Sequence, residues 1–117
     1  KIWLRTGEKI PVAVPDGCLL LQSGIQLEML TGGHIQAGFH EVVYNDKTEE
    51  AYQKAVKNGK STWRISSTLF SHIRQDVILG PLEQFKNLEG ASKYKYISAK
   101  EQVLDELRHI NLAPSQQ

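Results

Sequence analysis

Short β-prone runs separated by tight turn signals are the feature that most limits the folds open to this chain. Residues 2–5, 9–14 and 18–22 are rich in Ile, Val and Leu, residue types found in strands and buried cores. Thr-Gly-Glu lies between the first two runs and Pro-Asp-Gly between the second and third, and both tripeptides are typical of turns. The spacing predicts a β-meander.

A different pattern, rich in strong helix formers, occupies residues 49–58. Either Asp46 or Thr48 offers a side chain that can cap the start of a helix here. Gly59 follows the pattern, at the position where a glycine commonly ends a helix. The sequence therefore predicts a short surface helix between two strands.

The remaining segments add two strands and a final helix. Residues 35–44 and 61–70 return to strand-type composition, while residues 81–85 suggest one helical turn. Ser98 begins a capping box, and residues 99–110 then place apolar side chains on one helical face. We expect the α+β class, mainly β with helices, and a C-terminal helix.

Composition excludes several classes of protein. The length of 117 residues fits one domain, and the 14 basic and 13 acidic residues form no dense basic stripe, so nucleic acid is not an expected partner. The apolar runs fall far below the ~20 residues that a membrane helix needs. Cys18 is the single cysteine and lies in a run that predicts a buried strand. We therefore expect a soluble protein of a reducing compartment, the cytoplasm.

Two places in the chain carry candidate chemistry: His40, in the strand that follows a glycine turn at 31–33, and Arg64 with Ser66. Imidazole is the commonest metal ligand among side chains. Arg64 presents a planar fork of donors that matches a carboxylate, and strand alternation places Ser66 on the same face. Taken alone, His40 is as compatible with a structural histidine, and Arg64 with a surface ion pair.

In five features the chain resembles the C-terminal half of the isopenicillin N synthase-like, 2-oxoglutarate/Fe(II)-dependent dioxygenase superfamily. They are the strand and glycine at 18–24, the Leu-Glu pair at 27–28, the turn at 31–33, the His-containing strand at 40–43 and the Arg-x-Ser motif at 64–66. The resemblance implies a partial double-stranded β-helix (jelly roll), with residues 1–117 as a single domain forming the C-terminal portion of an oxygenase barrel.

The resemblance also implies a role for each candidate residue. His40 becomes the third ligand of Fe(II), while Arg64 and Ser66 bind the far carboxylate of the co-substrate 2-oxoglutarate or, in the isopenicillin N synthase mode, a carboxylate of the substrate. The functional atoms of His40 and Arg64 are then about 7–11 Å apart, the length of a five-carbon diacid with one coordination bond and one hydrogen bond. The implied partners are a small-molecule substrate and the missing N-terminal part of the same barrel.

Departures from the family pattern leave a second interpretation open. None of the four histidines is followed two positions later by Asp or Glu, so the His-x-Asp/Glu pair that supplies the other two ligands has no match. The helix-forming insert at 49–58 lengthens the interval between His40 and Arg64. Because ligands are missing, the chain is expected to be inactive alone, and the alternative is a non-catalytic β-rich binding or structural domain without metal.

Overall fold

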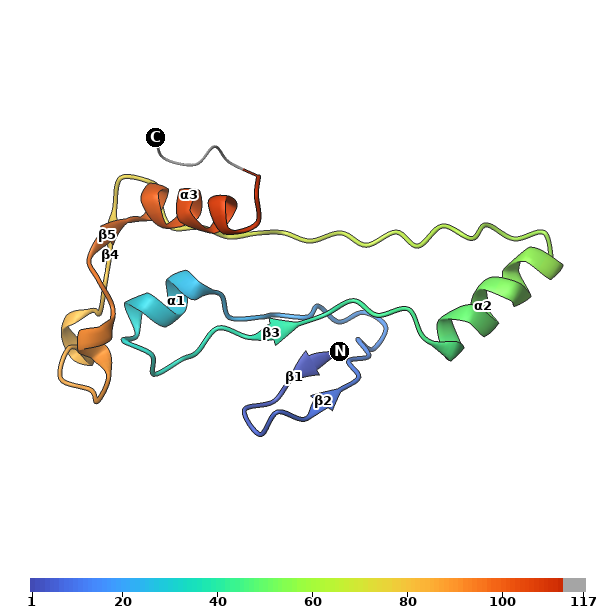
Figure 1. The fold of residues 1–117 in the computed structure, drawn as a ribbon, viewed down its shortest axis with the longest axis horizontal. Helices are drawn as coiled ribbons and strands as arrows, with labels where there is room; N and C mark the ends of the chain where they lie inside the picture. Colours follow the sequence, from blue (N-terminus) through green and yellow to red (C-terminus); the bar gives the residue numbers. More distant parts are fainter. Residues whose placement is uncertain (113–117) are drawn as a thin grey trace. The chain divides into compact units, whose positions relative to one another are not determined.

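The computed structural model describes residues 1–112 of the chain. Its contacts divide the chain into two compact units. Unit 1 comprises Lys1–Ala13 and Phe39–Phe70, and unit 2 comprises Val14–Gly38 and Ser71–Gln117, of which the last five residues lie outside the described part. The described chain contains three α-helices and two small antiparallel sheets (Figure 1). The expected α+β class is confirmed, and the expectation of a single domain stays a prediction.

The sheet of unit 1 is built around the first strand of the chain. Strand β1 (Ile2–Trp3) lies between β2 (Lys9–Ile10) and β3 (Phe39–His40), and both neighbours run antiparallel to it. The predicted turn between the first two runs is closed by a hydrogen bond of 2.8 Å from the Leu4 N–H to the Glu8 carbonyl. The first two predicted strands are thus confirmed in their first two residues, although each is shorter than the sequence suggested.

Helix α2 (Asp46–Lys57) begins three residues earlier than residues 49–58 predicted, because Asn45 caps it. The Asn45 side chain accepts a hydrogen bond of 3.1 Å from the Thr48 N–H. In return, the Asn45 N–H donates to the Thr48 hydroxyl at 3.4 Å, which completes a capping box. The prediction that Asp46 or Thr48 is the cap was wrong; Thr48 is the reciprocal partner, and an Asn is as good a cap as an Asp.

All three helices end in the same way. The residue after the helix C-cap has positive φ in each case: Gly32 at 56° after α1 (Ile25–Leu30), Gly59 at 61° after α2, and Asn111 at 59° after α3 (Ala99–His109). Its backbone N–H and that of the next residue bond back to carbonyls of the last turn. This is the Schellman arrangement, and it confirms the predicted end of α2 at Gly59.

Unit 2 contains a small apolar core. Strand β4 (Ile78–Leu79) pairs with β5 (Ile97–Ser98), and the Leu79 side chain is fully buried. The core consists of Met29, Leu79 and Ala99, with Ile25, Leu30, Tyr94 and Ile97 packed against it. Two 3-10 turns, η1 (Glu83–Phe85) and η2 (Ala91–Lys93), lie between the two strands in the sequence. The helical turn predicted at 81–85 is therefore present.

Helix α3 agrees with its prediction, residues 99–110, to within one residue. The Ser98 hydroxyl accepts a hydrogen bond of 3.1 Å from the Glu101 N–H, as the capping pattern predicts. Its Gln102 side chain is buried and accepts a hydrogen bond of 2.9 Å from Gln26 of α1. The Gln26 oxygen in turn accepts from the Ile73 N–H at 2.9 Å. One buried amide pair thus joins three segments of unit 2.

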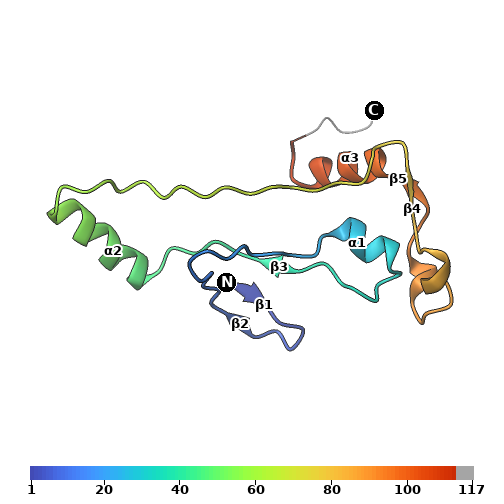
Figure 2. The same ribbon diagram turned by 180° about the vertical axis from the view of Figure 1, so that it is seen from behind.

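Three other strand predictions were too long or wrong. Residues 18–22 and 61–70 have no strand in the structure, and only Phe39–His40 of the predicted 35–44 strand is paired (Figure 1, Figure 2). The predicted burial of Cys18 was also wrong, because the cysteine is exposed. A strand forms only where another strand accepts its backbone hydrogen bonds, and neither run belongs to a sheet within residues 1–112.

Candidate functional site

His40 lies where the sequence placed it, on a β-strand, and is exposed. It ends β3 opposite Ile2 of β1. The chain just beyond it is fixed by the Glu41 N–H, which donates to the Lys1 carbonyl at 2.9 Å. The Glu41 carboxylate forms an ion pair of 3.2 Å with Lys9, whose ammonium also lies 4.0 Å from the centre of the Trp3 ring. The strand that carries His40 is therefore held on its β1 side, while its role as a metal ligand stays a prediction.

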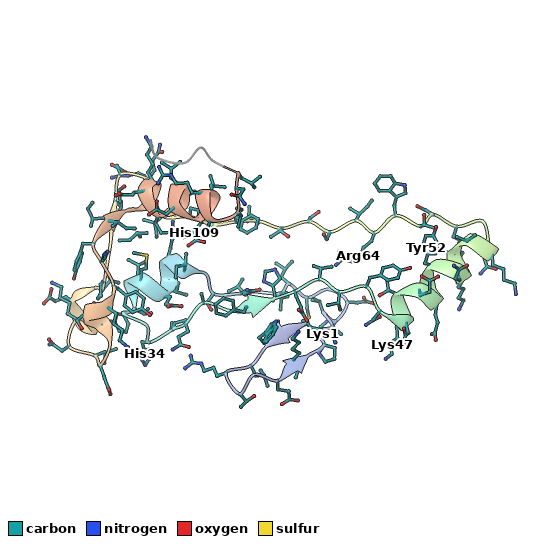
Figure 3. All side chains as sticks on the ribbon, in the orientation of Figure 1. Lys1, His34, Lys47, Tyr52, Arg64 and His109 are labelled. Carbon is teal, nitrogen blue, oxygen red and sulfur yellow. The ribbon has the colours of Figure 1, made fainter. Side chains whose placement is uncertain are left out.

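Arg64 lies on the extended segment that follows α2 (Figure 3). Ser66 lies two positions further along this segment, and both residues are exposed. This exposure follows from the absence of a covering layer among residues 1–112: the flanking Trp63 and Ile65 side chains are 86% and 88% exposed. His40 and Arg64 belong to the same unit, and their predicted separation of about 7–11 Å stays a prediction.

The described residues do not fit an Fe(II) ion by themselves. A non-haem iron site of this kind takes two imidazoles and one carboxylate, and within residues 1–112 no group of three or more His, Cys, Asp or Glu side chains could hold a metal ion. His34, the nearest histidine in sequence, belongs to unit 2 and stacks on Phe85 with ring centroids 5.9 Å apart. His40 supplies one donor at most.

Glu28, a carboxylate that the family resemblance includes, is engaged in holding the fold. One oxygen accepts a hydrogen bond of 2.8 Å from the Tyr94 hydroxyl, and the other accepts one of 2.6 Å from the Ala37 N–H. Donation to this carboxylate raises the pKa of Tyr94, and burial raises it further. Gly33 is required beside this pair, because a Cβ there would lie 2.7 Å from the Tyr94 oxygen. No local pattern in the sequence indicates a pair 66 positions apart.

A second polar network, also missed from the sequence, lies at the start of α2. The Tyr44 hydroxyl donates to the Glu49 carboxylate, whose other oxygen accepts a hydrogen bond of 2.7 Å from Gln53. The bond from Tyr44 is the main reason that the pKa of Glu49 is lowered, and it raises the pKa of Tyr44. The spacing of Glu49 and Gln53, four positions on a helix, was the available signal. The network orders the insert between His40 and Arg64.

No helix in residues 1–112 has both the length and the apolar character needed to cross a bilayer. This finding agrees with the short apolar runs of the sequence.

Comparison with known proteins gives one informative relative. No family model matches the chain, and no solved structure matches it. The chain is 28% identical over 94 residues to a curated protein of Oryza sativa subsp. japonica called 2-oxoglutarate-dependent dioxygenase 11. The match covers 80% of this chain and 22% of that protein, so the chain spans about a fifth of the relative's length. Most of the chain is therefore similar to part of a 2-oxoglutarate-dependent dioxygenase.

Proposed function

We propose that the chain is the C-terminal part of a non-haem Fe(II), 2-oxoglutarate-dependent oxygenase, an oxidoreductase of the isopenicillin N synthase-like kind. The observation that supports this most is the similarity to a 2-oxoglutarate-dependent dioxygenase over 80% of the chain. The five sequence features of the superfamily support it independently. In this proposal the chain is the C-terminal portion of a jelly-roll barrel, and residues 61–70, which are extended but belong to no strand in the described chain, would gain strand partners from the rest of that barrel.

Within that barrel the residues of unit 1 have separate roles. His40 is one of the iron ligands. Arg64 binds the far carboxylate of 2-oxoglutarate with two parallel N–H donors, and the Ser66 hydroxyl adds a third donor from the same strand face. Bound iron would supply the oxygen chemistry, and these residues would hold the iron and bind and orient the co-substrate. A small organic molecule is the substrate, and the cytoplasm is the proposed location.

The proposal requires ligands from outside the described residues. Because His40 is a single donor and no three-donor group exists in residues 1–112, a second histidine and a carboxylate must come from the N-terminal part of the same barrel. That part is the proposed partner of this chain. It would also cover the exposed apolar side chains of unit 1, including Trp63 and Phe39, which are 86% and 75% exposed.

One observation favours the alternative, a non-catalytic β-rich binding or structural domain. It is the same lack of a three-donor group within the described chain, which a domain without metal would share. The two functions differ in whether the protein binds Fe(II). The 117 residues alone should bind Fe(II) weakly in a calorimetric titration and show no oxygenase turnover; tight, stoichiometric binding by this chain would contradict the assignment of the missing ligands.

The protein with its N-terminal part provides the decisive experiment. There, Arg64→Lys should raise the apparent KM for 2-oxoglutarate roughly ten- to hundredfold, because the bidentate charge-assisted bond contributes about 1.5–3 kcal/mol. Arg5→Lys, in the exposed turn before β2, is the matched control and should leave this KM unchanged.

The metal assignment is tested in the same protein. His40→Ala should abolish stoichiometric Fe(II) binding, whereas His72→Ala should not. Unchanged iron binding in His40→Ala would mean that other residues hold the metal, whereas no stoichiometric binding in the parent protein would favour the domain without metal. An unchanged KM in Arg64→Lys would mean that another residue binds the co-substrate carboxylate.

A further inference from the structure

The sequence contains a single Asn-Gly dipeptide, Asn58-Gly59, and it lies at the C-terminal end of α2. In such a dipeptide the glycine nitrogen can attack the Asn side-chain carbonyl carbon, because glycine has no Cβ to shield its nitrogen. Both residues are exposed. Each of the other asparagines precedes a residue with a bulky side chain, Asp or Leu: Asn45, Asn87 and Asn111. Asn58 is therefore the asparagine most open to this spontaneous modification.

The reaction is the loss of ammonia from Asn58, followed by the addition of water. The Gly59 nitrogen bonds to the Asn58 side-chain carbon, the bond from that carbon to the amide nitrogen breaks, and the Gly59 proton leaves with ammonia. Water then opens the five-membered ring at either carbonyl. The products are aspartate and isoaspartate, and neither step needs an oxidant or a metal.

The structure holds both reacting groups in hydrogen bonds at the end of the helix. The Asn58 side-chain amide donates to the Lys54 carbonyl at 2.8 Å. The Gly59 N–H donates to the Val56 carbonyl at 3.1 Å. While these bonds last, the Asn58 side chain faces the helix and the Gly59 nitrogen keeps its proton. The attack therefore requires the last turn of α2 to open.

Such opening has little packing to oppose it. Helix α2 has 12 residues and buries no side chain (Figure 1), and a helix of this length gains most of its stability from packing. Helix ends are also the parts that open most readily. Reaction at Asn58 should thus follow the fraction of time that this turn is open.

The products cannot restore the closed turn. An aspartate at position 58 has no N–H to donate to the Lys54 carbonyl, and its negative charge lies at a helix C-terminus, where it is unfavourable. An isoaspartate adds one atom to the backbone and displaces the Gly59 N–H from the Val56 carbonyl. Modification therefore favours further opening.

We propose that Asn58-Gly59 is a deamidation site, that closure of the last turn of α2 protects it, and that its product keeps this turn open. The proposal does not rest on the proposed oxygenase function, since neither iron nor 2-oxoglutarate takes part in the reaction. It concerns the helix that lies between His40 and Arg64 in the sequence.

Peptide mapping by mass spectrometry tests the site in the 117-residue chain at neutral pH. Asn58 should lose its amide, whereas Asn111 should keep it; Asn111 also lies at a helix end and is exposed, but Leu112 follows it. The same chain unfolded in urea should react at Asn58 roughly tenfold faster, because every molecule is then open. Loss from Asn111 as fast as from Asn58, or no loss from Asn58 in urea, would overturn the site.

The protection is tested by weakening the last turn. Ala55→Gly introduces a poor helix former there and should speed the reaction of Asn58 in the folded chain roughly fivefold, without changing the rate in urea. Ala13→Gly makes the same substitution at an exposed position outside the helices and should change neither rate. Equal rates in the folded and unfolded chain, or no effect of Ala55→Gly, would overturn the protection.

The effect of the product is tested with Asn58→Asp. Amide hydrogen exchange at Gly59 should become roughly fivefold faster than in the parent chain, because a donor is lost and a charge opposes the helix dipole. Asn87→Asp, outside α2, should leave this exchange unchanged. Unchanged exchange at Gly59 in Asn58→Asp would overturn the claim that the product keeps the turn open.

Discussion

The two units of the chain differ in what they bury. Every buried residue of the described chain belongs to unit 2, and no residue of unit 1 is buried. Unit 2 packs α1, α3 and a two-stranded sheet around Leu79. Unit 1 has a three-stranded sheet of two-residue strands, and its helix α2 buries no side chain.

The residues that form the core and the residues with proposed binding roles therefore lie in different units. His40, Arg64 and Ser66 all lie in unit 1. A small sheet gains stability when a second layer covers one of its faces, and Phe39 and Trp63 remain exposed for such a layer. Unit 2 has the elements of a small core, whereas unit 1 has the candidate binding residues and lacks the cover that would order them.

The largest expected effect on stability comes from a matched pair of substitutions, each of which shortens one apolar side chain to Ala. Leu79→Ala removes the fully buried side chain of unit 2 and should lower the free energy of unfolding by about 2–5 kcal/mol. Ile65→Ala, on a side chain 88% exposed in unit 1, should change it by less than ~0.5 kcal/mol. Urea unfolding followed by far-UV CD measures both.

Tryptophan fluorescence separates the units in the same experiment, because Trp3 and Trp63 are the two tryptophans of the chain and both lie in unit 1. Leu79→Ala should leave their emission at native conditions unchanged. A large loss of stability in Ile65→Ala would contradict the comparison, since it would mean that unit 1 has a core of its own.

Local signals explain which elements the sequence predicted well. The helix at 99–110 and the end of the insert helix at Gly59 depend on residues within a turn of each other, and both were confirmed. Helix α1 has only six residues, too few for its periodicity to distinguish it from a strand. Residues 61–70 have the composition of a strand, but pairing depends on a partner that composition does not specify.

The candidate site was predictable to a smaller extent. The sequence placed His40 on a strand, and the structure agrees. It did not reveal the exposure of Arg64, because burial depends on what packs over a segment, and the residues of the segment do not specify this. Nor did it reveal the bond from Tyr94 to Glu28 or the bridge from Gln26 to Gln102, which join residues 66 and 76 positions apart. Such contacts follow from packing and leave no periodic trace.

The second prediction tests that buried amide bridge. Gln102→Ala leaves the Gln26 amide of unit 2 without its 2.9 Å partner in a buried place, which should cost about 1–3 kcal/mol of unfolding free energy. Gln53→Ala removes a helical amide bond of 2.7 Å in unit 1, but on an exposed surface, so its effect should be a few tenths of that. Chemical denaturation of the two variants compares them. Equal losses would show that the polar contacts of unit 1 are as important to stability as those of unit 2.

The smallest expected effect is a pH dependence confined to α2 of unit 1. The pKa of Glu49 is lowered from its usual 4.5, first by the hydrogen bond from Tyr44 and then by that from Gln53. A lowered folded pKa contributes stability above the unfolded value, and this contribution is lost as the pH falls through the lowered value. The helix should therefore fray below pH 4.5.

An NMR titration tests this effect. Tyr44→Phe should raise the pKa of Glu49, whereas Tyr52→Phe should not. The Leu79 methyl signals should not respond to the loss of the hydrogen bond from Tyr44 to Glu49. The comparison fails if acid shifts the Leu79 methyl signals together with the signals of α2, and if this shift is smaller in Tyr44→Phe. Such a result would mean that the two units are coupled.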